Sequence, residues 1–453
     1  MRLSRIMKLA SPLSFLVVAL LLVPLAALHA ADAPAKKPNI VFILADDIGL
    51  PGFGCTGGIY KTPNIDALAA GGTRFEYCFS APLCAPSRAM LMTGRYAFRT
   101  GVTSNHTGEQ VTPQKDGCVA QLMKQAGYVT ALAGKWRQLT YLSTKEDGAK
   151  WGFDEFLTWG ADDDEKGDRY WDPDYNLNGG KLANTAGKYG PDVLQEFAID
   201  FIQRHKEGPF FLYYPTPLAH EPIVRTPDSK SESPAKKGKL KKAGNSLDEL
   251  YADNIAYLDK QIGQLVAELD KLNLREKTLI VFAGDNGSVP IGTVNGRAVD
   301  GKKHGMNDGG SRVPLIANWK GVTPAGVVLK DLVDFTDMLP TFAELGGAAL
   351  PTDRKIDGHS YAPQLRGEKG TPREWAYVQL GEKRYVRSEG WKLTGGGKLY
   401  DMSDAPFAEK PVSVETDASK AARVKLQAAL AGLHDDSSPA KPLSKKAMRK
   451  AAK

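Results

Sequence analysis

The stretch NIVFILADDIG, residues 39–49, decides the fold of this chain. Its first half carries no charge and is rich in β-branched residues, which is typical of a strand buried on both faces of a parallel sheet. Asp46 and Asp47 follow this apolar run. Because ligands of open α/β sheets bind beyond the carboxyl ends of the strands, we expect both carboxylates to lie at a binding edge.

Apolar runs of the same kind recur along the chain, with helical patterns between them. The clearest helix is predicted over 247–271, where apolar residues recur at spacings of three and four, and Ser246 with Glu249 forms a capping box at its start. A shorter helix is predicted over 119–125. The alternation predicts an α/β fold with one large, mostly parallel sheet sandwiched by helices. The further predicted strands are residues 128–133, 210–214, 278–283 and 313–319.

The pattern changes after residue 350. Short β-rich runs separated by turns predict a small antiparallel sheet, and an Ala-rich pattern near 418–431 predicts a helix that accompanies it. We therefore expect a catalytic domain over 37–345, a small C-terminal α+β subdomain over 346–433 and a basic disordered tail over 434–453. The strands predicted for the small sheet are residues 375–380, 383–387, 391–393 and 398–400.

The chain has 453 residues and a net charge of +7, and the positive excess lies at its two ends. The nearly neutral middle argues against nucleic acid as a partner. Residues 1–30 have the pattern of a secretory signal, with basic residues before an apolar run and small residues after it. We expect a secreted or periplasmic protein with no stable membrane insertion once the signal is removed, and an uncleaved anchor is the alternative. The Lys-rich stretch 226–244 is predicted to be a mobile surface loop, with a basic lid as the alternative.

A second pair of oxygen donors, Asp285 and Asn286, follows the apolar run 278–283. Together with Asp46 and Asp47 it forms a set without thiol or imidazole, which is the ligand type that Ca²⁺ and Mg²⁺ prefer. Asp and Asn at strand ends are also common turn formers. Two such pairs after two apolar strands favour a metal site.

The segment CAPSR, residues 84–88, reads as the start of a helix with Pro86 in its first turn. Cys84 would then lie at a helix N-terminus, where anions are favoured, and Arg88 could bind an anionic group. An inert core cysteine is the alternative. Further cations and donors elsewhere complete a set suited to a tetrahedral oxyanion ester. They are Lys135, Arg137, His220, Lys303 and Arg312.

Several motifs in a fixed order resemble those of the type I sulfatase family, whose fold is related to that of alkaline phosphatase. CAPSR and LMTGR at 91–95 resemble the signature around the cysteine that becomes formylglycine. The resemblance covers about residues 37–345, with a weaker match over 375–401. The other matching blocks are LADDIG at 44–49, AGKW at 133–136, GDNG at 284–287 and DGGSRVP at 308–314.

The resemblance implies that a formylglycine-generating maturation enzyme oxidises Cys84 after translation. One hydroxyl of the hydrated aldehyde would attack sulfur, and the other would expel the sulfate. The resemblance also implies a metal ion, Ca²⁺ or alternatively Mg²⁺, with Cys84 among the residues around it. Its other ligands would be Asp46, Asp47, Asp285 and Asn286.

The same resemblance implies roles for the basic residues. Arg88 and Lys135 would position and neutralise the charged centre, and His220 and Lys303 would contact the sulfate or protonate the leaving oxygen. The implied activity is hydrolysis of sulfate esters of carbohydrates or aryl alcohols. The implied substrate is a sulfated small molecule or glycan.

The sequence departs from the family at two positions. The family usually has Lys-Trp-His where this chain has Lys135-Trp136-Arg137, and arginine stays protonated and cannot act as a general base. Arg137 could instead bind the sulfate or a second anion of the substrate, and His106 is an alternative base. The second departure is Asp308, where glutamate is common.

Two other functions remain open on the sequence. One is a phosphodiesterase or phosphonate monoester hydrolase on the same scaffold, and the other is a degenerate protein that binds sulfated glycans without turnover. Acids and aromatics over 160–180 predict either a sugar-binding rim or a structured insertion. The pairing of Cys55, Cys78 and Cys118 also stays open.

Overall fold

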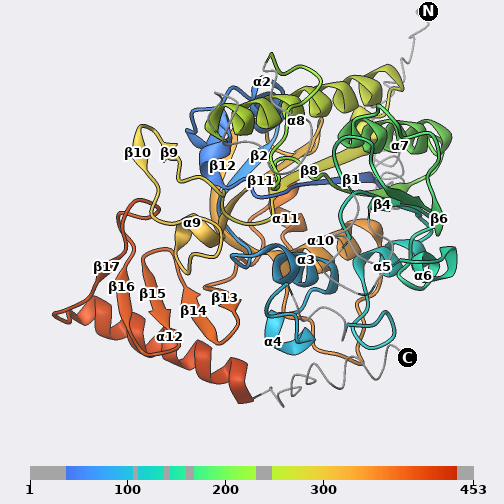
Figure 1. Ribbon diagram of the computed structural model, residues 1–453. Helices are drawn as coiled ribbons and strands as arrows, with labels where there is room; N and C mark the ends of the chain where they lie inside the picture. Colours follow the sequence, from blue (N-terminus) through green and yellow to red (C-terminus); the bar gives the residue numbers. More distant parts are fainter. Residues whose placement is uncertain are drawn as a thin grey trace, which may run out of the picture. The chain divides into compact units, whose positions relative to one another are not determined.

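Strand β1 (Asn39–Ala45) lies inside a ten-stranded sheet, and all of its residues are buried (Figure 1). It pairs in parallel with β7 (Phe210–Pro215) on one side and with β8 (Thr278–Gly284) on the other. Beyond β7 come β3 (Val129–Ala133) and β4 (Glu155–Trp159), also parallel. β1, β7, β8 and β3 fall within a residue or two of the runs that predicted them, whereas β4 was not predicted, and the expectation of a large, mostly parallel sheet is confirmed.

The other half of the sheet is mixed. β11 (Arg312–Trp319) runs antiparallel both to β8 and to β2 (Thr73–Phe79), while β12 (Val327–Asp334) is parallel to β2. The segment between β8 and β11 contains a two-stranded hairpin of β9 and β10 and a single short helix, α9 (Asp308–Ser311). Without a long crossover helix the chain enters β11 at the edge where β8 ends, so β11 runs in the opposite direction.

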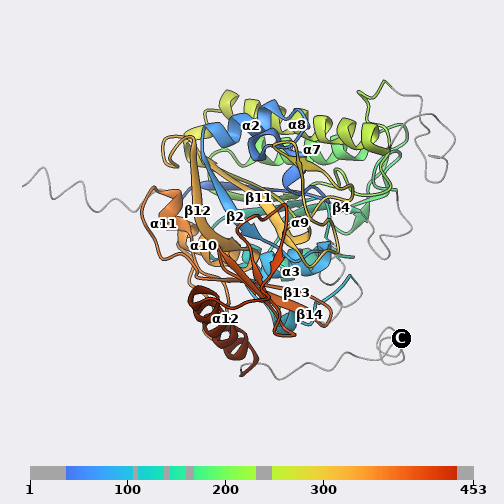
Figure 2. The same cartoon turned by 90° about the vertical axis from the view of Figure 1, so that its left-hand side faces the viewer.

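Helices cover both faces of the sheet (Figure 2). Val41 and Ile43 of β1 pack in one core with α2 (Pro63–Ala70), α7 (Gly190–Arg204) and α8 (Leu247–Lys271). The residues between them, such as Phe42, belong to the core on the opposite face. Alternate residues of a strand point to opposite faces, so one apolar strand serves both cores. The helices of that second core include α3 (Cys84–Thr93), α5 (Val119–Gln125) and α10 (Met338–Gly346).

The C-terminal part forms a five-stranded antiparallel sheet, as expected, and α12 (Asp417–Asp435) packs against its middle strands. Its order is β13-β14-β15-β16-β17, and β13 also contacts β12 of the large sheet. The small sheet thus adjoins the mixed half of the large one. Its strands are β13 (Ala376–Leu380), β14 (Lys383–Arg387), β15 (Trp391–Thr394), β16 (Leu399–Asp401) and β17 (Lys410–Pro411).

The computed structural model describes residues 37–105, 111–136, 140, 142–159, 168–230 and 247–435. The predicted signal, nearly all of the predicted tail and most of the predicted loop 226–244 lie outside them. Within the described ranges no helix has both the length and the apolar character needed to cross a membrane. The remaining short elements are α4 (Ala97–Thr100), α6 (Lys145–Lys150), α11 (Ala362–Leu365), β5 (Tyr175–Leu177), β6 (Gly180–Lys181), β9 (Thr293–Val294), β10 (Arg297–Ala298) and the 3₁₀ turns Leu50–Gly52, Gly54–Thr56, Arg275–Lys277 and Phe335–Asp337.

Candidate active site

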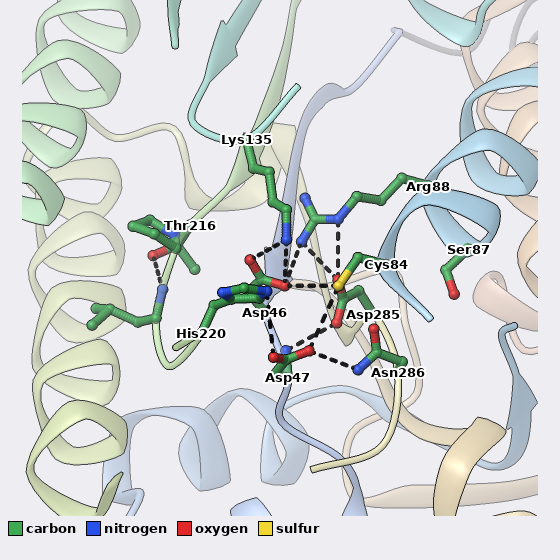
Figure 3. A network of polar contacts seen from close by, with 12 residues as sticks. Asp46, Asp47, Cys84, Ser87, Arg88, Lys135, Thr216, His220, Asp285 and Asn286 are labelled. Carbon is green, nitrogen blue, oxygen red and sulfur yellow. Dashed lines mark hydrogen bonds and ion pairs between the residues drawn. The ribbon is translucent and has the colours of Figure 1, made fainter. Parts of the chain in front are cut away.

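Polar side chains from the ends of four neighbouring strands meet at one edge of the large sheet (Figure 3). The strands are β8, β1, β7 and β3, in that spatial order. Helix α3 adds its first turn, and the loop before α9 adds a lysine that contacts the same group. The structure therefore brings together most of the residues that the sequence singled out. They are Asp46, Asp47, Cys84, Arg88, Lys135, His220, Asp285, Asn286 and Lys303.

Backbone hydrogen bonds fix the two adjacent aspartates. Asp46 N donates to Leu218 O at 2.9 Å, Ala219 N donates to Asp46 O at 2.8 Å, and Asp47 N donates to Asp285 Oδ1 at 3.0 Å. Asp47 has a φ of 61°, a left-handed conformation that aspartate tolerates better than most residues. Consecutive side chains of a strand point in opposite directions, and this break lets both carboxylates face the site (Figure 3).

Cys84 is the first residue of α3 and lies between the two carboxylates. Its Sγ is 3.6 Å from Asp46 Oδ1 and 3.6 Å from Asp47 Oδ1. The next backbone amide, Ala85 N, donates to Asn105 Oδ1 at 3.1 Å, so the first turn of the helix is held in place. Burial raises the pKa of the Cys84 thiol, and the surrounding carboxylates add to this effect. The unmodified thiol therefore stays protonated at neutral pH.

Two buried cationic side chains, Arg88 and Lys135, form ion pairs with the carboxylates of Asp46 and Asp285. Arg88 Nε and Nη2 donate to Asp285 Oδ2 at 3.1 and 2.8 Å, and Nη2 also lies 3.3 Å from Asp46 Oδ1. Lys135 Nζ donates to Asp46 Oδ2 at 2.7 Å. Although burial opposes ionisation, Lys135 and the other neighbouring cations hold the pKa of Asp46 well below its usual range. Asp46 is therefore a carboxylate at neutral pH.

His220 and Lys303 lie on the other side of Asp47. Lys303 Nζ donates to Asp47 Oδ2 at 2.6 Å and lies 3.3 Å from His220 Nε2. His220 Nδ1 is 2.6 Å from Glu221 O and 3.2 Å from Arg169 Nη1; because the contact with the carbonyl oxygen is the shorter one, we assign the ring proton to Nδ1, which leaves Nε2 as an acceptor. Burial, with a further contribution from Lys135, lowers the pKa of His220 to about 4. The proton at this end of the site therefore belongs to Lys303.

Three carboxylates and one amide oxygen converge at the centre of the site. Burial, and next the charge of Asp46, raise the pKa of Asp285 to about 7. Asn286 donates through Nδ2 to Asp47 Oδ1 at 2.9 Å, while its buried Oδ1 has no hydrogen-bond partner. Single ligand atoms of Asp46, Asp47, Cys84 and His220 all lie within 4.8 Å of one another. Carboxylate and amide oxygens in this arrangement suit a hard divalent cation.

Some of the predicted residues lie elsewhere. Arg137 and His106 fall outside the described residues. Arg312 donates to the backbone oxygen of Glu76 at 3.0 Å and pairs with Asp308, so it is not part of this site. Tyr170 and Tyr175 are buried, so neither forms a sugar-binding rim. All four cysteines are free.

Three residues around the site were not predicted. Ser288 accepts from Gly49 N at 2.9 Å through Oγ, and Tyr251 donates to Asp47 O at 2.8 Å. Arg169 Nη1 lies 3.2 Å from His220 Nδ1. Ser288 follows the GDNG motif and could have been found there, whereas Tyr251 belongs to the apolar stripe of α8 and Arg169 carries no sequence signal.

The comparisons with known proteins agree with this geometry. A family model described as Sulfatase matches residues 38–348, which is more than half of the chain. N-acetylgalactosamine-6-sulfatase of Canis lupus familiaris is 34% identical over 399 residues, which cover 80% of this chain and 72% of that protein. Arylsulfatase D of Homo sapiens is 29% identical over 460 residues, with coverage of 82% and 75%.

Similarity extends to solved structures. The structure of Ps i-CgsB in complex with k-i-k-neocarrahexaose has a TM-score of 0.75 and 26% sequence identity, and the match covers 92% of this chain and 98% of that one. Fold, motif order and relatives thus agree over the same region. The chain belongs to the sulfatase family and is a sulfuric ester hydrolase.

Proposed function

We propose that this protein is an exported sulfatase that hydrolyses sulfate esters of carbohydrates or aryl alcohols with a formylglycine derived from Cys84 and a bound Ca²⁺. The observation that carries the proposal is the position of Cys84. It begins a buried helix, it heads the motif CAPSR, and its Sγ lies 3.6 Å from each of two carboxylates. A formylglycine-generating enzyme would act on this segment as the maturation partner.

The raised pKa of the thiol supports the modification. A cysteine that stays protonated is a poor nucleophile. The hydrated aldehyde of a formylglycine at position 84 would supply a hydroxyl as the attacking group. A serine at this position would form a stable ester that water must then hydrolyse, which explains why the chemistry starts from a cysteine.

The oxygen donors of Asp46, Asp47, Asp285 and Asn286 fit a hard cation such as Ca²⁺, with Mg²⁺ as the alternative. The unpartnered Oδ1 of Asn286 and the raised pKa of Asp285 both indicate a missing positive charge. Bound there, the cation would neutralise the carboxylates and supply positive charge for a sulfate oxygen. Cys84 contributes to the same cluster, and the position of His220 beside it supports a role next to the metal.

The basic residues would divide the remaining tasks. Arg88 and Lys135 would hold the sulfate oxygens and the charge that develops on them, because both are fixed by buried carboxylates. Lys303 carries the proton that faces the neutral Nε2 of His220. We therefore assign Lys303 as the donor to the leaving oxygen, and His220 as the group that orients it. Arg137 stays a proposed contact to the sulfate or to a second anion.

Two further features support the substrate class and the compartment. One relative is named for a sulfate on N-acetylgalactosamine, and one structural neighbour was solved with a bound hexaose. Both support a sulfated carbohydrate. The signal-like pattern of residues 1–30 supports a secreted or periplasmic location.

The test is mass spectrometry of the peptide that contains Cys84, taken from protein made in its native host. We expect the mass of an aldehyde, which a hydrazide reagent traps. The same preparation is then assayed with matched sulfate esters, phosphodiesters and phosphonate monoesters, and sulfate esters should turn over fastest. An unmodified thiol throughout the sample, or a preference for the phosphorus esters, would contradict the proposal.

A further inference from the structure

A cavity of about 370 Å³ lies where β14 begins and β15 ends in the small sheet, and within the described residues its charged lining is mainly basic. This volume is in the range of ligand pockets in proteins. The walls come from the ends of β14 and β15 and from the loop that leads to α9. The lining residues are Met306, Glu382, Lys383, Arg384, Tyr385, Thr394, Gly395 and Gly396.

The two cations of this cavity have no acidic partner. Neither Lys383 nor Arg384 forms an ion pair or donates a side-chain hydrogen bond to any described residue, and the buried Nε of Arg384 is without an acceptor. Glu382 is the one acidic residue of the lining, and it is exposed. A buried guanidinium donor without an acceptor is unfavourable, and an anionic ligand would satisfy it.

The shape of the cavity depends on Gly395. Its backbone N donates to Arg384 O at 2.8 Å, which ties the two strands together. A Cβ at this position would lie 2.8 Å from Arg384 Cγ, so a side chain there would displace the arginine. The absence of a side chain at Gly395 thus lets Arg384 lie along the cavity wall.

Two chain connections link this cavity to the candidate active site. Met306 lies three positions after Lys303 in one loop. On the other side, Gly381 N donates to Thr103 O at 2.9 Å, and the segment of Thr103 continues to Asn105, which holds the first turn of α3. A substrate longer than one sugar would extend from Cys84 along these segments to the cavity.

We infer that this cavity is a subsite for an anionic sugar residue, one carrying a sulfate or a carboxylate, next to the residue whose sulfate is removed. The inference rests on the proposed function and deepens it, because it makes a polyanionic oligosaccharide the preferred substrate. Arg384 binds the anionic group with its forked donors, and Lys383 adds charge at the rim.

Binding is measured on the full-length protein with Cys84→Ser, which separates recognition from turnover. The probes are sulfated hexasaccharides from carrageenan and from chondroitin sulfate, with their desulfated forms as blanks. We expect Arg384→Gln to raise the Kd of the hexasaccharide that binds best about tenfold, and Lys383→Gln to raise it less. The control is Lys410→Gln, an exposed lysine on β17 at the opposite edge of the same sheet, which should leave the Kd unchanged.

Turnover gives a second readout on matured protein. The ratio of kcat/KM for that hexasaccharide to kcat/KM for 4-nitrophenyl sulfate should fall about tenfold in Arg384→Gln, because the aryl ester is too short to reach the cavity. An unchanged Kd for every hexasaccharide in Arg384→Gln, or no binding of any hexasaccharide to the parent protein, overturns the inference. Failure of the proposed function is a different result, namely an unmodified Cys84 and no sulfate release from either substrate.

Discussion

Lys303 Nζ lies 2.6 Å from Asp47 Oδ2, although 256 positions separate the two residues in the chain. The backbone of Lys303 is held as well, since its N donates to Ser288 O at 3.0 Å, just beyond Asp285 and Asn286. The backbone of the candidate proton donor, Lys303, is thus hydrogen-bonded to the segment that carries the candidate metal ligands Asp285 and Asn286. A change to the lysine side chain should therefore act on chemistry and leave the fold intact.

Lys303→Met should lower kcat about 10²- to 10³-fold, because the substitution removes the proton that faces the leaving oxygen. The loss should be smaller for substrates with acidic leaving alcohols, which need less protonation. The measurement is kcat for a series of aryl sulfates of graded leaving-group pKa. Lys302→Met, at the exposed neighbouring position, is the control and should keep full activity. Equal losses across the series would remove the proton-donor role from Lys303.

Cys84→Ala should abolish sulfate release and leave the fold intact, since one small side chain is lost. Cys118→Ala is the matched control, because Cys118 is also buried and free but lies outside the site. It should keep turnover, with a cost in stability similar to that of Cys84→Ala. The readouts are sulfate release and the melting temperature. Parent-like activity in Cys84→Ala would contradict the proposed nucleophile.

Calcium should stabilise the protein more at high pH than at low pH. The pKa of Asp285 is about 7 in the metal-free fold and about 3.8 in the unfolded chain. A raised pKa means that the folded state holds this proton more tightly, so its stabilising effect is complete below about pH 4 and is lost as the pH rises through about 7. A cation that replaces the proton restores the lost stability at high pH.

The measurement is the melting temperature with Ca²⁺ and with a chelator between about pH 5 and pH 8. The difference between the two should grow with pH. The variant Asp285→Asn has no proton to lose at this position, so its difference in melting temperature should no longer increase with pH. If Ca²⁺ raises the melting temperature by the same amount at pH 5 and at pH 8, the cation does not compete with this proton.

The fold could be predicted from the sequence wherever a run of apolar residues is long enough to be buried on both faces. β1 and β8 were predicted over 39–44 and 278–283 and are observed over 39–45 and 278–284. β2 has no predicted counterpart, because Arg74 and Glu76 interrupt its apolar run and instead pair with each other at 3.0 Å. The direction of β11 depends on the connection that precedes it and not on its own residues.

The candidate site could be predicted to a similar extent. Asp46, Asp47 and Asp285 follow directly after strands whose ends share one edge, so their meeting is a consequence of the sheet. The contact between Arg169 and His220 joins residues on two loops, and no periodic pattern leads to it. The same holds for the pairing of Asp308 with Arg387, which only the docking of the small sheet brings about.

This last pairing supports the loop that carries Lys303. Arg387 on β14 is fully buried, and its Nε and Nη2 each lie 3.3 Å from a carboxylate oxygen of Asp308. The backbone N of Asp308 also donates a hydrogen bond to Glu409 Oε1 at 3.2 Å, which is a second contact with the C-terminal part. The aspartate that stands in place of the usual glutamate thus keeps a charged partner. Arg387 would act on Lys303 through this loop as a positioning residue.

Arg387→Met should lower the free energy of unfolding by about 3–5 kcal/mol, because it leaves the carboxylate of Asp308 buried with a weaker partner. It should also lower kcat at temperatures where the variant is still folded, since the loop that holds Lys303 loosens. The control is Arg423→Met, which breaks a partly exposed ion pair with Glu415 in the same subdomain and should cost about 0–1 kcal/mol.

The two effects of Arg387→Met are separable by a second substitution. Asp308→Asn in the Arg387→Met background removes the weakly paired buried charge, so it should return part of the lost stability. It does not rebuild the ion pair, so kcat should stay low. Recovery of kcat in step with stability would show that Arg387 contributes to the fold alone and has no part in positioning Lys303.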